Sequence, residues 1–295
     1  MAKEYAQNQD EDRVMKNRIS VVVITYNRPD AVKAAVNSLL NQSLEPFEII
    51  LIDNGSSSPL RLETIDARRL KLVRLNQLVG LSNARNYGIK IAKGEYFAFI
   101  DDDCIPSIQW LEEVQKGIEA GYDILGGPLR PKFMATPPEW WTEEEFGYCA
   151  GVGNAKTQEI WGGNLIIRKA VFDKIGFFNT RIGRQKGKLL GREEVELISK
   201  AKSYFKLLFL PKAVVFHQVP SERMTFRYIT RLNYYIGKTA KLESKNKHME
   251  SIIYFLMPII MKKFSPSKFS PSKISPQSKR IKKIAGMAQL FGRIV

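Results

Sequence analysis

The sequence of 295 residues is poor in cysteine and histidine, with two of each, and it has no long apolar run. Cys104 and Cys149 lie far apart and lack Cys-x-x-Cys spacing, so we expect free thiols in a reducing compartment, not a zinc site or a disulfide framework. Residues 1–18 have no apolar core, which predicts that there is no secretory signal. The apolar residues 252–261 include Pro258 and are too few to span a bilayer. These absences argue against a secreted disulfide-rich protein and against a membrane-spanning one.

Acidic residues are also scarce, since 30 Asp and Glu stand against 46 Lys and Arg and give a formal net charge of +16. Residues 241–295 concentrate this excess, with twelve Lys or Arg but only Glu243 and Glu250. Such a segment indicates an anionic partner, either a membrane surface or a nucleic acid. We interpret residues 244–295 as a basic extension in which a Ser/Pro/Lys linker joins amphipathic segments. This interpretation predicts a cytoplasmic protein that is peripheral on the inner face of the cell membrane.

Apolar patterns typical of strands and helices alternate from residue 19 to about residue 128. Residues 19–25 (ISVVVIT) form a continuous β-branched run, as expected of a buried parallel strand. A helical spacing of apolar residues follows at 29–42, with Pro29 at its start. The same patterns predict strands at 47–52, 71–75 and 96–100 and helices at 81–92 and 108–120. This rhythm predicts an α/β fold, with a Rossmann-like, mostly parallel sheet flanked by helices on both faces.

The pattern becomes irregular after residue 128. Residues 131–153 are rich in Pro, Trp and Glu and predict a long functional loop or lid. Further strands are expected at 162–167, 206–210 and 213–216, and further helices at 192–202 and 225–242. In the helix at 192–202 we expect Val195, Ile198 and Ala201 to face inward.

Three consecutive aspartates, Asp101 to Asp103, follow the apolar strand at 96–100 directly. Carboxylates placed together at the end of a buried strand repel one another and lose hydration, which raises their pKa values unless a cation compensates. Hard oxygen ligands favour Mg²⁺ or Mn²⁺, and these ions usually accompany a phosphate. The alternative is a solvated acidic turn that caps the next helix.

Polar residues also follow two other expected strands, at Thr25 to Arg28 and at Asp53. Ligands of open α/β sheets bind at the carboxyl ends of the strands, so this convergence predicts a binding site at one sheet edge. Residues 80–88 open a helix with a Gly-flanked polar turn, and its N-terminus beside Arg85 suits a phosphate. The alternative for Arg85 is a surface salt bridge.

Six blocks of this sequence occur together in a known family. They are ITYNR (24–28), LIDNGS (51–56), GLSNARNYGI (80–89), GEYFAFIDDDC (94–104), WGGNLIIRKAVFDKIGFF (161–178) and REEVEL (192–197). In this order they resemble family 2 glycosyltransferases with the GT-A fold, of the bacterial cell-surface or exopolysaccharide type, over about residues 19–240. The resemblance implies a polar tail (1–18), a GT-A domain (19–243) and the basic extension (244–295). The GT-A domain would have a nucleotide-binding half (19–128) and an acceptor and catalytic half (129–243).

The resemblance implies that the sheet edge binds a nucleotide sugar. Tyr26 and Asp53 would hold the base, with Thr25 nearby, while Asp102 would contact the ribose and Arg85 the donor sugar or its diphosphate. The residues implied for the nucleotide-sugar site are Thr25, Tyr26, Asn27, Asp53, Asn83, Arg85, Asp101, Asp102, Gly162, Gly163 and Asn164.

The implied metal ligands are Asp103 and, in support, Asp101. His217 ends an expected strand, where a histidine is commonly a packed structural residue; the resemblance adds it as a third candidate ligand. The implied ion is Mg²⁺ or Mn²⁺.

The family places its catalytic base in an acidic pair at a helix start, often Glu-Asp, and this chain has Glu193-Glu194 there. The change keeps a carboxylate but lengthens it by one methylene. Glu194 is our candidate base, with Glu193 and Glu196 as alternates. These acids would also stabilise a helix N-terminus electrostatically without any catalysis.

The sequence is therefore interpreted as a metal-assisted, inverting glycosyltransferase of the hexosyltransferase type. It would move sugar from a UDP-, GDP- or dTDP-linked donor to a glycan or lipid-linked acceptor in polysaccharide or glycoconjugate biosynthesis, by a single displacement. One alternative is a sugar-phosphate nucleotidyltransferase, which also places carboxylates and a metal on an α/β sheet. Another is a basic nucleic-acid-binding protein, although the charge lies mostly in the extension and no nucleic-acid partner is expected.

Overall fold

The computed structural model describes residues 19–45, 48–62, 69–151 and 158–243, together with 286, 287 and 289. The expected tail at 1–18 and nearly all of the expected basic extension lie outside these residues. The chain forms two compact units. The first comprises Met1–Lys132, Gly151–Thr180 and Glu193–Gln218, and the second comprises Phe133–Ala150, Arg181–Arg192 and Val219–Val295. The predicted halves at 19–128 and 129–243 are a division by role and stay a prediction.

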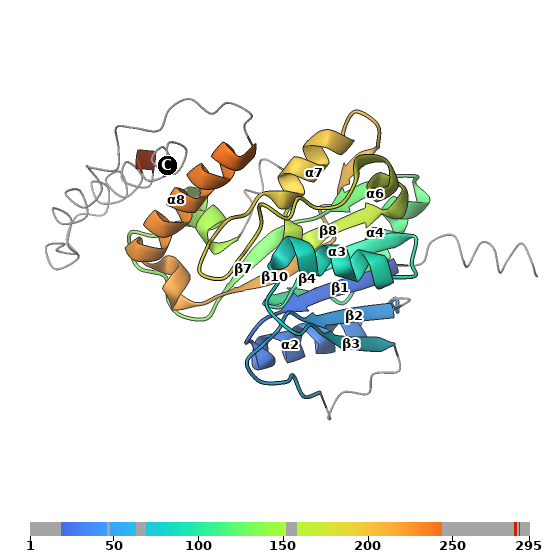
Figure 1. Cartoon of the computed structure of the whole chain (residues 1–295), viewed down its shortest axis with the longest axis horizontal. Helices are drawn as coiled ribbons and strands as arrows, with labels where there is room; N and C mark the ends of the chain where they lie inside the picture. The colour runs from blue at the N-terminus through green and yellow to red at the C-terminus, as the bar shows by residue number, and fades with distance from the viewer. Residues whose placement is uncertain are drawn as a thin grey trace, which may run out of the picture. The chain divides into compact units, whose positions relative to one another are not determined.

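A seven-stranded sheet forms the centre of the first unit, with the strand order β3-β2-β1-β4-β8-β6-β9 (Figure 1). Its strands are β1 (Ile19–Thr25), β2 (Glu48–Asp53), β3 (Leu70–Arg74), β4 (Tyr96–Asp101), β6 (Ile124–Gly126), β8 (Leu165–Arg168) and β9 (Leu207–Phe209). Neighbouring strands from β3 to β4 are parallel, as are β6 and β9, whereas β8 is antiparallel to both β4 and β6. The sheet is therefore mostly parallel, as predicted. A second sheet has the order β5 (Cys104–Pro106), β10 (Val215–Val219), β7 (Leu129–Phe133).

Helices lie between most of these strands along the chain. Those of the first unit are α2 (Pro29–Leu40), α3 (Leu81–Ile91), α4 (Trp110–Glu119), the 3-10 helix η2 (Gly162–Asn164), α6 (Lys169–Ile175) and α7 (Glu193–Ala201). Those of the second unit are α5 (Glu143–Phe146), η1 (Gly147–Ala150), η3 (Ser221–Met224) and α8 (Phe226–Glu243).

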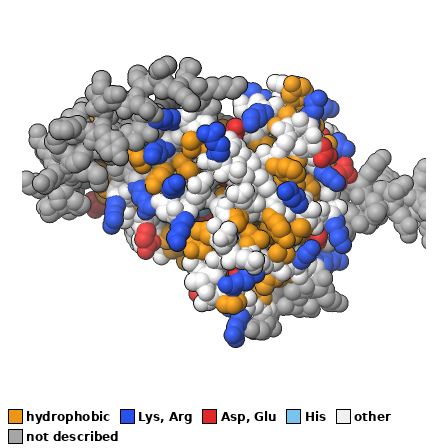
Figure 2. Space-filling model, viewed as in Figure 1, with side chains coloured by type: hydrophobic (Ala, Val, Ile, Leu, Met, Phe, Trp, Pro, Cys, Tyr) orange, Lys and Arg blue, Asp and Glu red, His pale blue; other side chains and the backbone are white. Residues whose placement is uncertain are grey.

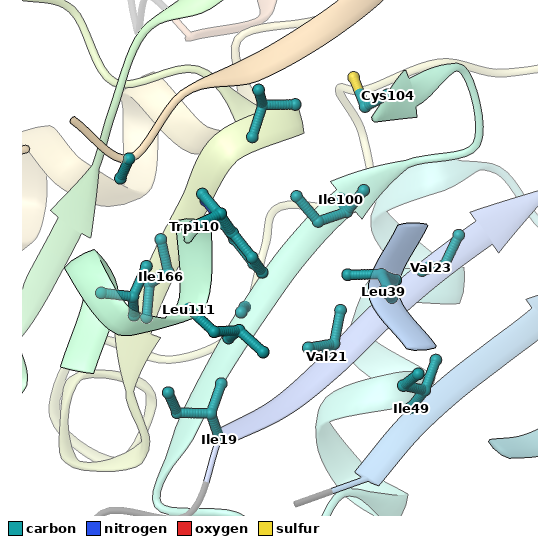
Figure 3. Close-up of a cluster of buried hydrophobic side chains, with 14 of the residues drawn as sticks. Ile19, Val21, Val23, Leu39, Ile49, Ile100, Cys104, Trp110, Leu111 and Ile166 are labelled. Carbon is teal, nitrogen blue, oxygen red and sulfur yellow. The ribbon is translucent and has the colours of Figure 1, made fainter. Parts of the chain in front are cut away.

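One face of the large sheet is covered by α2 and α4. Alternate residues of β1, among them Val21 and Val23, point to this face because side chains alternate along a strand. They pack in one cluster with Leu39 of α2 and with Trp110 and Leu111 of α4 (Figure 3). All five side chains are completely buried, so this cluster holds α2 and α4 against the sheet beneath the carboxyl ends of β1 and β4.

The opposite face is covered by α3, α6 and α7. Val22 of β1 and Phe99 of β4 point to this face and join a cluster with Phe172 of α6 and Phe178. The rings of Phe99 and Phe178 meet edge to face, with centroids 5.3 Å apart. A Cβ added to Gly88 of α3 would lie 2.6 Å from Val22 Cγ1, so the glycine lets α3 approach the sheet closely. Helices thus cover both faces, as predicted.

The predicted elements between residues 19 and 120 are all present, with bounds that differ by at most two residues. Later in the chain three expectations were wrong. The strand expected at 213–216, with His217 at its end, is β10 (Val215–Val219), so His217 lies in the middle of the strand. The strand expected at 162–167 begins only at Leu165, because Gly162–Asn164 forms η2. Val195 of α7 is 39% exposed rather than inward, because the buried face of the helix includes Glu193 and Glu194, at 3% and 8% exposure.

The second unit is built around α8. Arg231 and Tyr235 both donate hydrogen bonds to the carbonyl oxygen of Gly187, at 2.6 and 3.3 Å, and Asn233 donates to the hydroxyl of Tyr148 at 2.9 Å. The predicted loop at 131–153 is partly regular, since it includes α5 and η1; its role as a lid stays a prediction. No helix in the described part of the chain combines the length and the apolar character needed to cross a membrane. Figure 2 shows more Lys and Arg than Asp and Glu side chains on the viewed face.

Candidate active site

The carboxyl ends of β2, β1 and β4 lie side by side in the first unit. Thr25 of β1 pairs with Asp53 of β2, and Ile24 pairs with Asp101 of β4. The predicted convergence of polar residues from adjacent strands is therefore confirmed. Thr25 and Asp53 are buried, whereas Tyr26 is 36% exposed.

The loop after β1 is tied to the loop after β2 through Asn27. This residue adopts a left-handed backbone with φ of 55°, a conformation that asparagine tolerates better than most residues. Its Oδ1 accepts hydrogen bonds from the amide and the hydroxyl of Ser57, at 2.8 and 3.0 Å, and its amide donates to Ser56 Oγ at 2.9 Å. These contacts fix the direction in which the chain leaves β1, and hence where Arg28 starts.

Asp53 holds the loop after β2 and retains one acceptor oxygen. Its Oδ1 accepts a hydrogen bond from the amide of Ser56 at 2.9 Å. Its Oδ2 is buried and accepts no hydrogen bond from the described residues, although Arg74 Nη1 lies 3.5 Å away as an ion-pair partner. A buried carboxylate oxygen with spare acceptor capacity suits the N–H groups of a nucleotide base.

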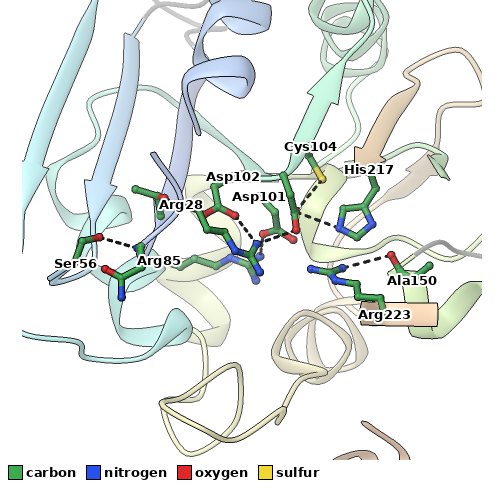
Figure 4. A network of polar contacts seen from close by, with 12 residues as sticks. Arg28, Ser56, Arg85, Asp101, Asp102, Cys104, Ala150, His217 and Arg223 are labelled. Carbon is green, nitrogen blue, oxygen red and sulfur yellow. Dashed lines mark hydrogen bonds and ion pairs between the residues drawn. The ribbon is translucent and has the colours of Figure 1, made fainter. Parts of the chain in front are cut away.

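Each aspartate of the triplet has different partners. Asp102 accepts hydrogen bonds from Thr25 Oγ1 at 2.9 Å and from Arg28 Nη1 at 3.0 Å. The Oδ2 of Asp103 accepts from the same Nη1 at 2.9 Å, and its Oδ1 lies 3.1 Å from His217 Nε2. Burial raises the pKa of Asp102 to about 6, even though Arg28 opposes the shift. Figure 4 shows Arg28, Asp102 and His217 in this network of polar contacts.

Asp103, Cys104 and His217 form a cluster of possible metal ligands. The strands β5 and β10 pair His217 with Cys104, and one ligand atom from each of the three residues lies within 4.8 Å of the others. All three side chains are buried. A carboxylate and an imidazole are suitable ligands for Mn²⁺, whereas a thiol is a softer ligand than Mg²⁺ or Mn²⁺ prefers. Asp103 and His217 therefore fit the implied ion, and Cys104 does not need to bind it.

Arg85 lies buried between the triplet and α7, with 2% exposure. Its Nη1 donates to Glu193 Oε1 at 2.8 Å, and its Nη2 donates to Asp101 Oδ1 at 3.0 Å and to the carbonyl oxygen of Gly162 at 3.2 Å. The rings of Phe99 and Phe178 each lie 5.7 Å from the guanidinium carbon. Burial alone would lower the pKa of Arg85, but Asp101, Glu193 and Glu194 outweigh it and keep the guanidinium charged. In this arrangement Arg85 contacts acids rather than solvent, so its contact with the donor stays a prediction.

The two glutamates at the start of α7 lie in different environments. Glu193 uses Oε1 to bind Arg85, while its Oε2 is buried and accepts no hydrogen bond within the part of the chain that the structure describes. The pKa of Glu194 is raised to about 7, first by burial and then by the charge of Glu193, with Arg85 opposing. Glu196 instead pairs with Lys200 at 2.8 Å on a more exposed face. Of the three candidate bases, Glu194 thus has a pKa raised into the range of a base that works near neutral pH.

The three residues of η2 and Asn83 have different surroundings. A Cβ on Gly162 would lie 2.8 Å from Arg85 Nη2, and one on Gly163 would lie 3.1 Å from Asp101 Oδ2. Asn164 is fully buried, accepts from Trp110 Nε1 at 2.9 Å and donates to the carbonyl oxygen of Ala213 at 2.8 Å. Asn83 is exposed at the start of α3 and donates to the carbonyl oxygen of Val79 at 2.9 Å. The glycines admit close neighbours, while Asn164 joins β8 to α4.

Arg28, like Cys104, lies in this site although the sequence suggested no individual role for it. It ends the block ITYNR, and its guanidinium reaches two aspartates more than 70 residues away. The only sequence signal was its position between a strand end and Pro29, which starts α2.

The sequence profile of glycosyl transferase family 2 matches residues 20–176, just over half of the chain. The chain belongs to this family. A solved structure of the mannosyltransferase PcManGT from Pyrobaculum calidifontis, in complex with GDP-Man and Mn²⁺, matches with a TM-score of 0.59 at 16% identity. The match covers 92% of this chain and 74% of that one. The predicted GT-A fold is confirmed.

Two curated relatives are named as glycosyltransferases. The glucosyl-dolichyl phosphate glucuronosyltransferase of Haloferax volcanii is 24% identical over 240 residues, which are 76% of this chain and 77% of that protein. The UDP-Glc:alpha-D-GlcNAc-diphosphoundecaprenol beta-1,3-glucosyltransferase WfaP of Escherichia coli is 36% identical over 87 residues, 29% of this chain and 35% of that one. The chain thus resembles glycosyltransferases that are named for lipid-linked substrates.

Proposed function

We propose that the protein is an inverting glycosyltransferase of the hexosyltransferase type that uses a nucleotide-sugar donor. The main support for this proposal is the environment of Glu194. Its carboxylate is buried, has a pKa of about 7 and adjoins the strand ends where the donor is expected. Arg85 joins the two regions, since it binds Glu193 on one side and Asp101 on the other. A base and a donor site connected in this way suit a direct displacement.

In the proposed step Glu194 takes the proton from the acceptor hydroxyl. The hydroxyl oxygen attacks the anomeric carbon on the face opposite the leaving group, and the bond from that carbon to the diphosphate oxygen breaks. One displacement of this kind inverts the anomeric configuration. Glu193, neutralised by Arg85, holds the start of α7 in place and stays out of the proton transfer.

The chain's own residues would position the donor. Tyr26 and Asp53 would contact the base, and Asp102 the ribose. Asp103 and His217, whose facing atoms are 3.1 Å apart, would hold Mg²⁺ or Mn²⁺. When bound there, the ion would supply positive charge against the charge that develops on the leaving diphosphate.

The acceptor is proposed to be a glycan or a lipid-linked sugar in polysaccharide or glycoconjugate synthesis. The names of the archaeal and bacterial relatives, with dolichyl phosphate and diphosphoundecaprenol, support a lipid-linked one. A peripheral position on the cytoplasmic face of the membrane would bring the enzyme to such an acceptor. The excess of Lys and Arg in residues 241–295 supports that position, because cationic side chains are attracted to anionic lipid.

A panel of UDP-, GDP- and dTDP-linked sugars, each with Mn²⁺ or Mg²⁺, tests the proposal and identifies the donor. Hydrolysis of one donor should release nucleoside diphosphate, require the added ion and stop in chelator. Asp103→Ala should lower the rate at least about a hundredfold while the circular dichroism spectrum is kept. Release of pyrophosphate from a sugar phosphate and a nucleoside triphosphate would instead identify a nucleotidyltransferase. Full activity of Asp103→Ala would refute its role.

A further inference from the structure

Arg28 bridges two aspartates of the candidate metal site with a single nitrogen. Its Nη1 lies 3.0 Å from Asp102 Oδ1 and 2.9 Å from Asp103 Oδ2. The aspartate side chains are 9% and 10% exposed, whereas the side chain of Arg28 is 47% exposed. The cation therefore reaches into the acidic cluster from the solvent side, and it can leave without disturbing the core.

The backbone around Arg28 sets its starting point. Asn27, with its left-handed conformation and its hydrogen bonds to Ser57, turns the chain at the end of β1. Pro29 follows and begins α2. The Cα of Arg28 is thereby held at the sheet edge, whereas its long side chain can turn to a different partner.

The charges of this site favour an exchange of cations. Asp102 and Asp103 are largely buried, and two buried carboxylates side by side need a positive neighbour. Arg28 supplies one charge, but a divalent ion on Asp103 would supply two. A guanidinium and a divalent ion that both contact these two carboxylates would repel each other strongly, even at the screened strength typical of a protein surface. The two cations therefore compete for the same carboxylates.

We propose that Arg28 is an exchangeable counter-ion of the metal site. Its guanidinium neutralises Asp102 and Asp103 while no metal is bound, and it leaves these carboxylates when a divalent cation arrives. The inference rests on the proposed function, which places the ion at Asp103. Once released, a guanidinium at this edge is suited to bind a phosphate of the donor through paired hydrogen bonds. Arg28 would then weaken the binding of metal alone and favour the joint binding of metal and diphosphate.

The test is a titration of the full chain with Mn²⁺ alone, without nucleotide, in which free Mn²⁺ is followed by electron paramagnetic resonance. Arg28→Gln should bind Mn²⁺ at least about tenfold more tightly than the natural chain, because the competing charge is gone. Arg168→Gln is the matched control. Arg168 also bridges two acids, Glu95 and Asp123, with its side chain 42% exposed, and it pairs with Tyr96 at the opposite end of β4. Its variant should leave the affinity for Mn²⁺ unchanged.

The variant Asp103→Asn distinguishes a failure of the proposed exchange from a failure of the proposed metal site. If Asp103→Asn loses Mn²⁺ and Arg28→Gln binds it no more tightly than the natural chain, the exchange is refuted while the proposed metal site stands. If neither the natural chain nor Arg28→Gln binds Mn²⁺, the proposed metal site and the proposed exchange are both refuted. Arg28→Met keeps the apolar stem of the side chain and serves as the second variant if Arg28→Gln does not fold. It should give the same tightening, and an unchanged affinity would overturn the inference.

Discussion

Glu193 and Glu194 are chemically identical neighbours in different electrostatic states. One guanidinium, Arg85, stands among Asp101, Glu193 and Glu194, and of these three acids it forms hydrogen bonds with Asp101 and Glu193. Glu194 is also buried but receives no hydrogen bond from Arg85. Burial therefore disfavours its charged form and raises its pKa to about 7. The sequence allowed the acidic pair to be singled out, but it could not divide the pair. That division depends on an arginine more than 100 residues earlier in the chain.

Glu194→Gln should lower sugar transfer by about 10²- to 10⁴-fold, which is the usual contribution of a general base. In the natural protein the rate should fall as pH decreases below about 7, because the carboxylate that accepts the proton becomes protonated. The residual rate of Glu194→Gln should lack this pH dependence. Rates measured with the donor found in the nucleotide-sugar panel, between pH 5 and 9, check both expectations.

Glu196→Gln is the control for this change, since Glu196 lies on the same helix and pairs with Lys200. It should keep nearly full activity and the natural pH profile. A strong loss in Glu196→Gln combined with an active Glu194→Gln would reassign the base.

At the scale of elements, η2 and α7 hold opposite sides of Arg85. Gly162 of η2 accepts a hydrogen bond from the guanidinium, and Glu193 of α7 binds its other nitrogen. Periodicity predicted α7 but gave it the wrong inward face, with Val195 inside, because apolar spacing treats every glutamate as an outward residue. It also extended a strand through Gly162 to Asn164, because apolar spacing gave no weight to the Gly-Gly pair at which the chain turns to meet an arginine of α3.

Gly162→Ala tests whether this close approach matters. The new Cβ would lie 2.8 Å from Arg85 Nη2, so the guanidinium must move. We expect the fold to lose about 1–3 kcal/mol in urea unfolding and transfer to fall about tenfold or more. The decline in rate at low pH should shift to higher pH, because a more distant Arg85 lowers the pKa of Glu194 less.

Gly191→Ala is the matched control, because a Cβ there has no neighbour within 4 Å. It should leave stability, rate and pH profile close to those of the natural protein. An unchanged pH profile in Gly162→Ala would mean that Arg85 does not tune the base.

At the scale of the whole molecule, the sheet was predicted well because strand and helix patterns alternate and neighbouring parallel strands end at one edge. Thr25, Asp53 and Asp101 were expected together and lie together in the register of β2, β1 and β4. The bridge made by Arg28 and the burial of Arg85 were not predictable, since both depend on side-chain paths between segments distant in sequence. The basic extension was predicted from charge alone and lies outside the described residues.

Flotation with liposomes tests the proposed membrane association. The full chain should float with vesicles that contain anionic phosphatidylglycerol and should be released by about 0.5 M NaCl, because salt screens surface charges. A chain that ends at residue 243 lacks eleven of the twelve Lys and Arg in residues 241–295 and should stay at the bottom of the gradient. Vesicles of neutral lipid are the control for charge. Equal flotation of both chains would contradict a role for the extension.

The antiparallel strand β8 has a consequence for how the protein is made. β4 pairs with β1 on one side and with β8 on the other, and β8 ends only at Arg168, long after β4 ends at Asp101. While a ribosome makes the intervening residues, the nascent chain must leave one edge of β4 without its partner for about 3–13 s at ordinary rates of synthesis. β4 carries Tyr96, Phe97 and Phe99 on its two faces, and the open edge of an apolar strand invites pairing with other chains. Translation speed and chaperone supply should therefore influence the yield of folded protein.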